Sequence, residues 1–268
     1  MPFVQVRDIQ VYYELAGAGP RVLFIGGSGG DLRQKPGVFE GPLPRRFEVL
    51  SYDQRGLGRS DRPAGPYQMA EYGEDAAALL DALGWERCAV MGVSFGGMVA
   101  QELAVRHPER ISRMLLACTS SGGAGGASYP LHELATLSAE ERAARTLELA
   151  DNRHDAAWRQ ANPGAAQRVL ELTLERLRTG GGEPGRAEGQ RLQLEARHHH
   201  DTHARLPALT LPVLVCGGRY DGIAPISNQQ ALAAALPNAR LELFEGGHMF
   251  LLQDRGAWPL IVDFLAEC

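Results

Sequence analysis

Lysine is nearly absent from this chain of 268 residues, because Lys35 is the only lysine among 27 basic residues. A nucleotide-binding P-loop needs a lysine after its glycine-rich turn, and no such pair occurs here. No apolar run approaches the roughly 18 residues that span a bilayer. The formal net charge of −5 argues against a nucleic-acid partner, since phosphate binding needs a basic face. The first residues, MPFVQVRDIQ, lack the basic and apolar regions of a secretion signal, so we expect a cytoplasmic protein without a membrane partner.

Cysteine is also scarce, with four residues and no C-x-x-C pair. Cys88, Cys118 and Cys216 lie inside apolar runs. Such positions are typical of buried free thiols that pack as small hydrophobic side chains. We therefore expect no disulfide framework and no metal site.

What the chain does contain is short apolar runs that alternate with helical patterns. The segments VQV and IQVYYE predict a hairpin at the N-terminus. The runs at 21–27, 47–53, 88–93, 114–118, 213–216 and 241–244 predict buried strands, and 69–84, 95–108, 227–236 and a segment near Leu260 predict helices. This order indicates an α/β fold with a mostly parallel central sheet flanked by helices on both faces.

The segment 120–205 interrupts the alternation, because it shows helical patterns and no convincing strand. We predict a core formed by 1–119 and 206–268, with 120–205 inserted as a helical cap over the carboxyl ends of the strands. Two glycine-rich stretches, 122–126 and 180–182, would form a hinge and a mobile loop or simply slack connections.

The sequence Gly92-Val93-Ser94-Phe95-Gly96-Gly97 stands between a predicted buried strand and a predicted helix. A nucleophilic serine on such a tight turn has a strained backbone, and only very small flanking residues clear the neighbouring chain. Glycines two positions before and after Ser94 meet this need. The N–H of Phe95, at the start of the helix, would stabilise a developing oxyanion.

A nucleophilic serine needs a base, and the base needs an orienting acid. Among eight histidines, only His248 follows a late predicted strand and has glycines before it. Asp221 lies in the loop after the preceding predicted strand. The predicted catalytic residues are therefore Ser94, Asp221 and His248.

Four stretches together resemble the α/β-hydrolase superfamily: the glycine-rich turn 26–30, SYDQRGLGRSD, GVSFGG, and the pair GGRYDGIAP with GGHMF. Within it, the chain is similar to the small capped bacterial enzymes grouped with 3-oxoadipate enol-lactonase and related esterases. The resemblance implies the α/β-hydrolase fold, with Ser94 as nucleophile, His248 as base and Asp221 as orienting acid. It also implies that the segment 53–61 is structural and supports loops near the oxyanion turn.

The resemblance places the second oxyanion donor in the loop after the first central strand, at the N–H of Ser28 or next at Gly27. Gly26 stands where the family has a histidine that supports this loop, which puts the rigidity of the loop in doubt. As substrate-binding residues we consider Trp158 and His132 in the cap and Phe250 after His248.

The function expected from these residues is that of a cofactor-free serine hydrolase acting on a small-molecule ester or lactone, as a monomer or homodimer. Carbon–carbon bond hydrolysis of a diketone-type substrate uses the same residues and stays open. A non-hydrolytic receptor or cyclase on the same fold also stays open. A dinucleotide-binding domain is excluded by the lack of a G-x-G-x-x-G after the first strand.

Overall fold

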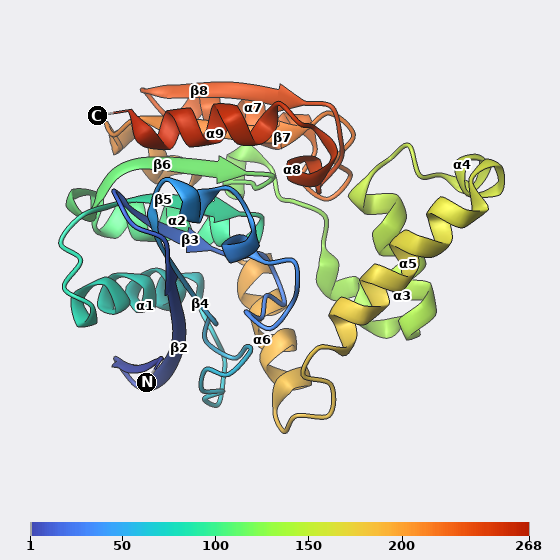
Figure 1. Ribbon diagram of the computed structural model, residues 1–268, viewed down its shortest axis with the longest axis horizontal. Coiled ribbons are helices and arrows are strands. Elements are labelled where there is room, and N and C mark those ends of the chain that lie inside the picture. Colours follow the sequence, from blue (N-terminus) through green and yellow to red (C-terminus); the bar gives the residue numbers. More distant parts are fainter. Residues whose placement is uncertain (1, 268) are drawn as a thin grey trace.

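An eight-stranded sheet runs through the centre of the computed structural model, which describes residues 2–267 (Figure 1). The strand order is β1-β2-β4-β3-β5-β6-β7-β8. The hairpin of β1 (Phe3–Val6) and β2 (Ile9–Ala16) is antiparallel, as is the β2–β4 pair, and the other pairs are parallel. The remaining strands are β3 (Arg21–Ile25), β4 (Glu48–Tyr52), β5 (Cys88–Val93), β6 (Ile111–Ala117), β7 (Val213–Gly218) and β8 (Ala239–Phe244). The predicted hairpin and the predicted mostly parallel sheet are both confirmed.

Helices cover both faces of this sheet, which is why its central strands are apolar throughout. In β5, Val90 packs into the core on one face and Met91 into the core on the other. The first face is covered by α1 (Met69–Ala82), α2 (Phe95–Arg106) and α7 (Ile226–Ala235), the second by α8 (Phe250–Gln253) and α9 (Ala257–Ala266). Cys88, Cys118 and Cys216 are buried free thiols, as predicted. No helix between residues 2 and 267 is both long and apolar enough to cross a membrane.

The segment between β6 and β7 is helical, as predicted. It contains α3 (Ala139–Ala150), α4 (Ala156–Ala161), α5 (Pro163–Arg178) and α6 (Arg186–His198). Short 3₁₀ turns lie at Val38–Glu40, Leu43–Arg45, Pro108–Arg110, Gly123–Gly125, Leu131–Thr136 and His203–Ala208. Figure 1 shows α3–α5 projecting beyond the carboxyl ends of the strands, while α6 returns toward the sheet. We refer to residues 120–205 as the insertion; its role as a cap stays a prediction.

The glycine-rich stretch 122–126 is packed, and the expectation of a slack connection there is wrong. A Cβ at Gly122 would lie 1.8 Å from the carbonyl oxygen of His200, and the φ of Gly122 is +68°. The N–H of Thr202 donates to the carbonyl of Ser121 at 2.9 Å. The two ends of the insertion are therefore joined directly to each other, and this close backbone approach is what requires glycine.

Candidate active site

Ser94 occupies the turn between β5 and α2, with φ 55° and ψ −117°. Its N–H donates to the carbonyl of Ala117 at 2.8 Å, which ties the turn to the end of β6. A Cβ at Gly96 would lie 2.0 Å from the carbonyl oxygen of Ile25, and one at Gly92 would lie 2.3 Å from that of Gly96. The glycine spacing is thus required by backbones that approach too closely for any side chain.

The three residues predicted as catalytic form one hydrogen-bonded chain. The imidazole Nε2 of His248 lies 3.0 Å from Ser94 Oγ, and its Nδ1 lies 2.8 Å from Asp221 Oδ2. The other carboxylate oxygen of Asp221 accepts the N–H groups of Ile223 and Ala224 at 2.8 and 2.9 Å. Because an ionised carboxylate only accepts, Nδ1 carries the proton and Nε2 is free to accept from the Ser94 hydroxyl. Asp221 is 2% exposed and therefore has a fixed orientation.

Of the residues predicted to donate to an oxyanion, Gly27 and Phe95 lie next to Ser94. A Cβ at Gly27 would lie 3.5 Å from Ser94 Cβ and 4.0 Å from its Oγ, so the backbone of Gly27 runs beside the hydroxyl. Phe95 is the first residue of α2, and the N–H groups of a first helical turn have no partner inside the helix. Within the described chain, the Ser28 hydroxyl is buried and has no hydrogen-bond partner. The donor roles of these residues stay predictions.

Two glutamines support the loop that carries Gly27 and Ser28. The side-chain amide of Gln54 donates to the carbonyl of Gly26 at 2.9 Å. The side-chain oxygen of Gln193, on α6, accepts the N–H of Gly29 at 2.8 Å. Both bonds fix the loop at the position where the histidine typical of the family is replaced by Gly26. Sequence reasoning did not find Gln193, because nothing in the sequence pairs it with a loop 164 positions away.

Asp53, which follows β4, holds the loop after β3 and the loop after β4 together. Its two carboxylate oxygens accept the N–H of Leu32 at 2.7 Å and the N–H of Arg59 at 2.8 Å. Burial raises the pKa of Asp53 to about 6, partly offset by these two backbone hydrogen bonds. The structural interpretation of residues 53–61 is therefore confirmed by these contacts.

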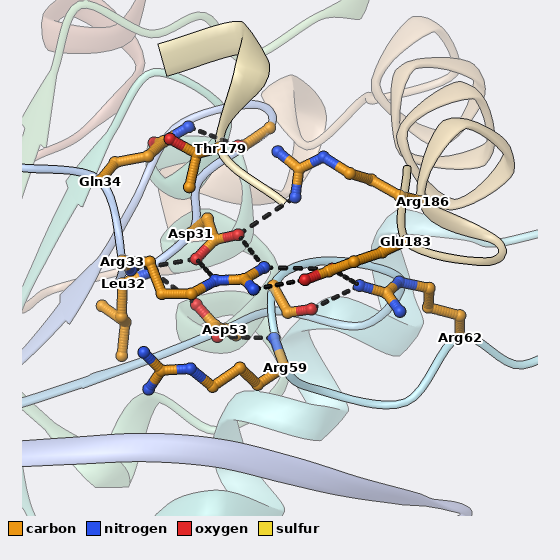
Figure 2. Close-up of polar contacts among 12 residues, drawn as sticks. Asp31, Leu32, Arg33, Gln34, Asp53, Arg59, Arg62, Thr179, Glu183 and Arg186 are labelled. Carbon is orange, nitrogen blue, oxygen red and sulfur yellow. Dashed lines mark hydrogen bonds and ion pairs between the residues drawn. The ribbon is translucent and has the colours of Figure 1, made fainter. Parts of the chain in front are cut away.

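A cluster of charged side chains joins the insertion to the loops that Asp53 connects (Figure 2). The carboxylate of Asp31 accepts from Arg33 at 2.7 Å and from Arg186 at 3.1 Å. Glu183 pairs with Arg62 at 2.7 Å and also with Arg33. The cluster connects the loop after β3, the loop after β4 and the start of α6. Ion pairs thus join the insertion to the loop that follows β3.

The end of α3 contacts both the loop that carries His248 and the loop that carries Asp221. The N–H of His248 donates to the carbonyl of Ala150 at 2.6 Å. The N–H of Gly222, next to Asp221, donates to the carbonyl of Leu149 at 2.9 Å. These backbone acceptors lie at the carboxyl end of α3, where carbonyls have no partner inside the helix. The His248 and Asp221 loops are therefore held by the same helix end.

Comparison with known proteins identifies the family of this chain. The model of a family described as alpha/beta hydrolase fold matches residues 20–254. The chain belongs to this family. It is 29% identical to 3-oxoadipate enol-lactonase 2 of Acinetobacter baylyi, across 96% of this chain and 93% of that one. It is 32% identical to a 2-hydroxymuconate semialdehyde hydrolase of Pseudomonas putida, across 94% of this chain and 89% of that one. The enol-lactonase structure from Burkholderia xenovorans LB400 superposes with a TM-score of 0.80 at 25% identity, covering 99% of this chain and 100% of that one.

In this α/β hydrolase, Phe250 does not line a pocket, and the expectation that it contacts substrate is corrected. Its side chain is 0% exposed and packs in the core on the α9 face of the sheet. The ring stacks on Phe244 with centroids 5.3 Å apart and planes 3° from parallel. Its position two residues after His248 suggested the site, but the first turn of α8 directs the ring into the core.

The other two predicted substrate-binding residues lie in the insertion of this α/β hydrolase. Trp158 is on α4, the part of the insertion that projects farthest from the sheet in Figure 1, and its ring packs against His154 at 4.1 Å. His132 packs against His198 at 4.5 Å between ring centroids. A contact of Trp158 or His132 with substrate stays a prediction.

One group of side chains has the composition of a metal site. Donor atoms of Cys118, Asp221 and His248 lie within 4.8 Å of one another. The Asp221 carboxylate is already engaged by the imidazole and by two backbone N–H groups. Burial raises the pKa of the Cys118 thiol well above its usual value, so the thiolate that binds metals is disfavoured. This donor set does not fit a metal ion.

Proposed function

We propose that the protein is a serine hydrolase that cleaves a carboxylic ester or lactone through an acyl-enzyme, without a cofactor. The observation that carries the proposal is the position of His248 between Ser94 Oγ, at 3.0 Å, and Asp221, at 2.8 Å. This places a general base within hydrogen-bond reach of a nucleophile and orients that base by a buried acid.

The reaction follows from these contacts. Ser94 Oγ attacks the carbonyl carbon while His248 Nε2 accepts the hydroxyl proton, and Asp221 stabilises the resulting imidazolium. The N–H of Phe95 and an N–H of the Gly27–Ser28 segment hold the oxyanion. His248 then gives its proton to the leaving alkoxide, which departs from an ester and remains tethered in a lactone. Water attacks the acyl-enzyme with His248 again as base, and the acid product leaves.

The comparisons support hydrolysis, and lactone hydrolysis in particular, because an enol-lactonase matches over nearly the full length of both chains. A second candidate is the hydrolysis of a carbon–carbon bond in a diketone-type substrate. It is favoured by the semialdehyde hydrolase, which is 32% identical to this chain. Both candidates use Ser94 and His248, and they differ in the bond that breaks.

The deciding experiment compares initial rates of p-nitrophenyl butyrate hydrolysis by the wild type and by Ser94→Ala. We expect the variant to lose several orders of magnitude in kcat, because the base and acid cannot replace the nucleophile. Equal near-background rates in the two proteins would contradict the ester proposal. Reaction of the wild type with a fluorophosphonate then separates a narrow serine hydrolase, which is labelled, from a non-hydrolytic receptor or cyclase, which is not.

A further inference from the structure

Four arginine side chains of the described chain are less than a tenth exposed, and one of them differs from the rest. Three form ion pairs with carboxylates: Arg55 with Asp8 and Asp75, Arg113 with Glu267, and Arg186 with Asp31. Arg197, near the end of α6, pairs with no carboxylate within residues 2–267, although it is only 5% exposed. A buried guanidinium that no carboxylate contacts carries a desolvation cost that an ion pair would reduce.

The contacts of Arg197 are all with neutral groups. Its Nη1 donates to the carbonyl of Tyr129 at 2.8 Å, and its Nη2 donates to the hydroxyl of Ser128 at 2.6 Å. Its Nε is buried and has no acceptor in the described structure. Burial lowers the pKa of Arg197 to about 10, which still leaves the guanidinium charged at neutral pH. The side chain is therefore a buried positive charge whose Nε–H has no acceptor in the described structure.

This arginine lines a small cavity between α2, the start of the insertion and the end of α6. The other polar side chains around the cavity include Ser120 and His200, and no aspartate or glutamate lines it. The Ser120 hydroxyl is buried without a partner in the described chain. Burial lowers the pKa of His200 to about 3, so its ring is neutral and offers one N–H. The cavity thus gathers hydrogen-bond donors around a positive charge.

The cavity lies next to the candidate active site. Met98, which lines it, is one helical turn after Ser94 on α2. Tyr129, which accepts from Arg197, donates its own N–H to the carbonyl of Ile223 at 2.7 Å, and Ile223 belongs to the Asp221 loop. The Asp221 carboxylate partly offsets the lowering of the Arg197 pKa by burial, without a contact between the two side chains in the described structure. The cavity is therefore joined to the candidate active site through α2 and through the Tyr129–Ile223 hydrogen bond, although none of Ser94, Asp221 and His248 lines it.

We propose that the cavity binds the anionic end of the substrate, a carboxylate, with Arg197 as its counter-charge. The inference rests on the proposed function and adds a substrate class to it: esters or lactones whose acyl chain ends in a carboxylate. The cavity has about 20 Å³, the room that one water occupies. One carboxylate oxygen fits this volume near Nε, while the rest of the group lies at the mouth. A ring or a branched alkyl end does not fit.

The test compares two esters that differ only at the far end of the acyl chain. In p-nitrophenyl hydrogen glutarate this end is a carboxylate, and in p-nitrophenyl pentanoate it is a methyl group. We expect the wild type to prefer the glutarate ester. In Arg197→Gln, KM for the glutarate ester rises about tenfold to hundredfold, because a charge-assisted hydrogen bond is lost. The loss for the pentanoate ester is at least about tenfold smaller than that for the glutarate ester, because pentanoate has no carboxylate to lose its partner, and Arg197→Lys retains part of the preference.

A merely structural role for Arg197 predicts a different result. The two esters would then lose activity alike, and Arg113→Gln, which removes a buried arginine at the far end of β6, would act similarly. That result, or a wild type without preference for glutarate, overturns the proposal. If neither ester reacts, the result contradicts the proposed ester hydrolysis but not the anion site. Calorimetric binding of glutarate to the wild type and to Arg197→Gln then decides the anion site, because the proposal requires binding to the wild type that the substitution abolishes. Arg197→Lys serves the same purpose if the glutamine variant does not fold.

Discussion

The backbone N–H of His248 donates to the carbonyl of Ala150 at 2.6 Å, so the candidate base is positioned by the inserted segment as well as by the sheet. Gly247 lies at this contact, and a Cβ there would be 1.9 Å from the Ala150 oxygen and 2.8 Å from Asp151 Cα. The two backbones cannot stay in place around a methyl group.

We therefore expect Gly247→Ala to displace His248 and to lower kcat by about a hundredfold, the effect of a displacement of about 1 Å at a reacting group. Gly164→Ala is the matched control, because a Cβ there meets only the end of the Arg168 side chain at 3.6 Å. Steady-state kinetics on p-nitrophenyl butyrate, with circular dichroism to establish folding, give the comparison. Equal activity of the two variants would show that α3 does not hold His248 in place.

Gly26 and Gly96 differ sharply in the space around them. No atom lies within 4 Å of a Cβ at Gly26, whereas one at Gly96 would lie 2.0 Å from the carbonyl oxygen of Ile25. We expect Gly26→Ala to keep kcat/KM within about twofold of the wild type, since nothing is displaced. Gly96→Ala should destabilise the fold by about 1–3 kcal/mol and suppress activity. Urea unfolding and esterase rates measure both effects, and a strong loss in Gly26→Ala would show that its flexibility is needed.

Gln193 accepts one hydrogen bond from the N–H of Gly29, in the loop that carries the candidate oxyanion donors Gly27 and Ser28. Removing its acceptor in Gln193→Leu should lower kcat about twofold to tenfold, the loss expected for one neutral hydrogen bond, and should change KM less. Gln167→Leu, on the exposed part of α5, is the control. A change confined to KM would assign Gln193 to substrate binding instead.

Asp31 neutralises the buried guanidinium of Arg186. In Asp31→Asn the charge of Arg186 loses its partner inside the protein, and we expect about 3–5 kcal/mol less stability in urea unfolding. Glu40→Gln breaks an exposed ion pair with Lys35 and should change stability little. If the two variants were equally stable, the cluster in Figure 2 would contribute nothing to holding the insertion.

His200 gives a pH-dependent prediction. Its pKa falls from 6.5 to about 3 in the folded protein because burial disfavours the imidazolium. Between these values the unfolded chain binds one more proton, so stability is fully present above pH 6.5 and is lost as the pH falls toward 3. As the pH falls through this window, the free energy of unfolding of the wild type should decrease more steeply than that of His200→Gln. The difference between the two slopes should reach about 1.4 kcal/mol per pH unit. Parallel urea titrations from neutral to acidic pH measure the slopes, and parallel slopes would contradict a buried neutral imidazole.

Much of the fold was predictable because its signals are local. The continuous apolar run of β5 follows from burial on both faces of a sheet. The mostly apolar α2 is buried around its whole circumference over residues 95–104. The glycines around Ser94 mark a turn that no larger residue can form. His248 and Asp221 were found by their places after late strands, since parallel strands bring their carboxyl ends to one edge.

The errors arose where tertiary packing decides. Phe250 follows the base closely in sequence, yet the turn of α8 places its ring in the core. The glycines at 122–126 read as slack, but they are required because a neighbouring backbone passes within contact distance. Neither arrangement leaves a periodic signal in the sequence.

The sequence by itself determined the α/β architecture and the chemistry available at Ser94, because both depend on local backbone requirements and on burial. Only the tertiary structure decided that the end of α3 holds the His248 loop, that Gln193 reaches Gly29, and that Arg197 is buried without a carboxylate. The contact of His248 with Ala150 joins residues 98 positions apart, and that of Gln193 with Gly29 joins residues 164 positions apart, so such pairs are specified by packing alone.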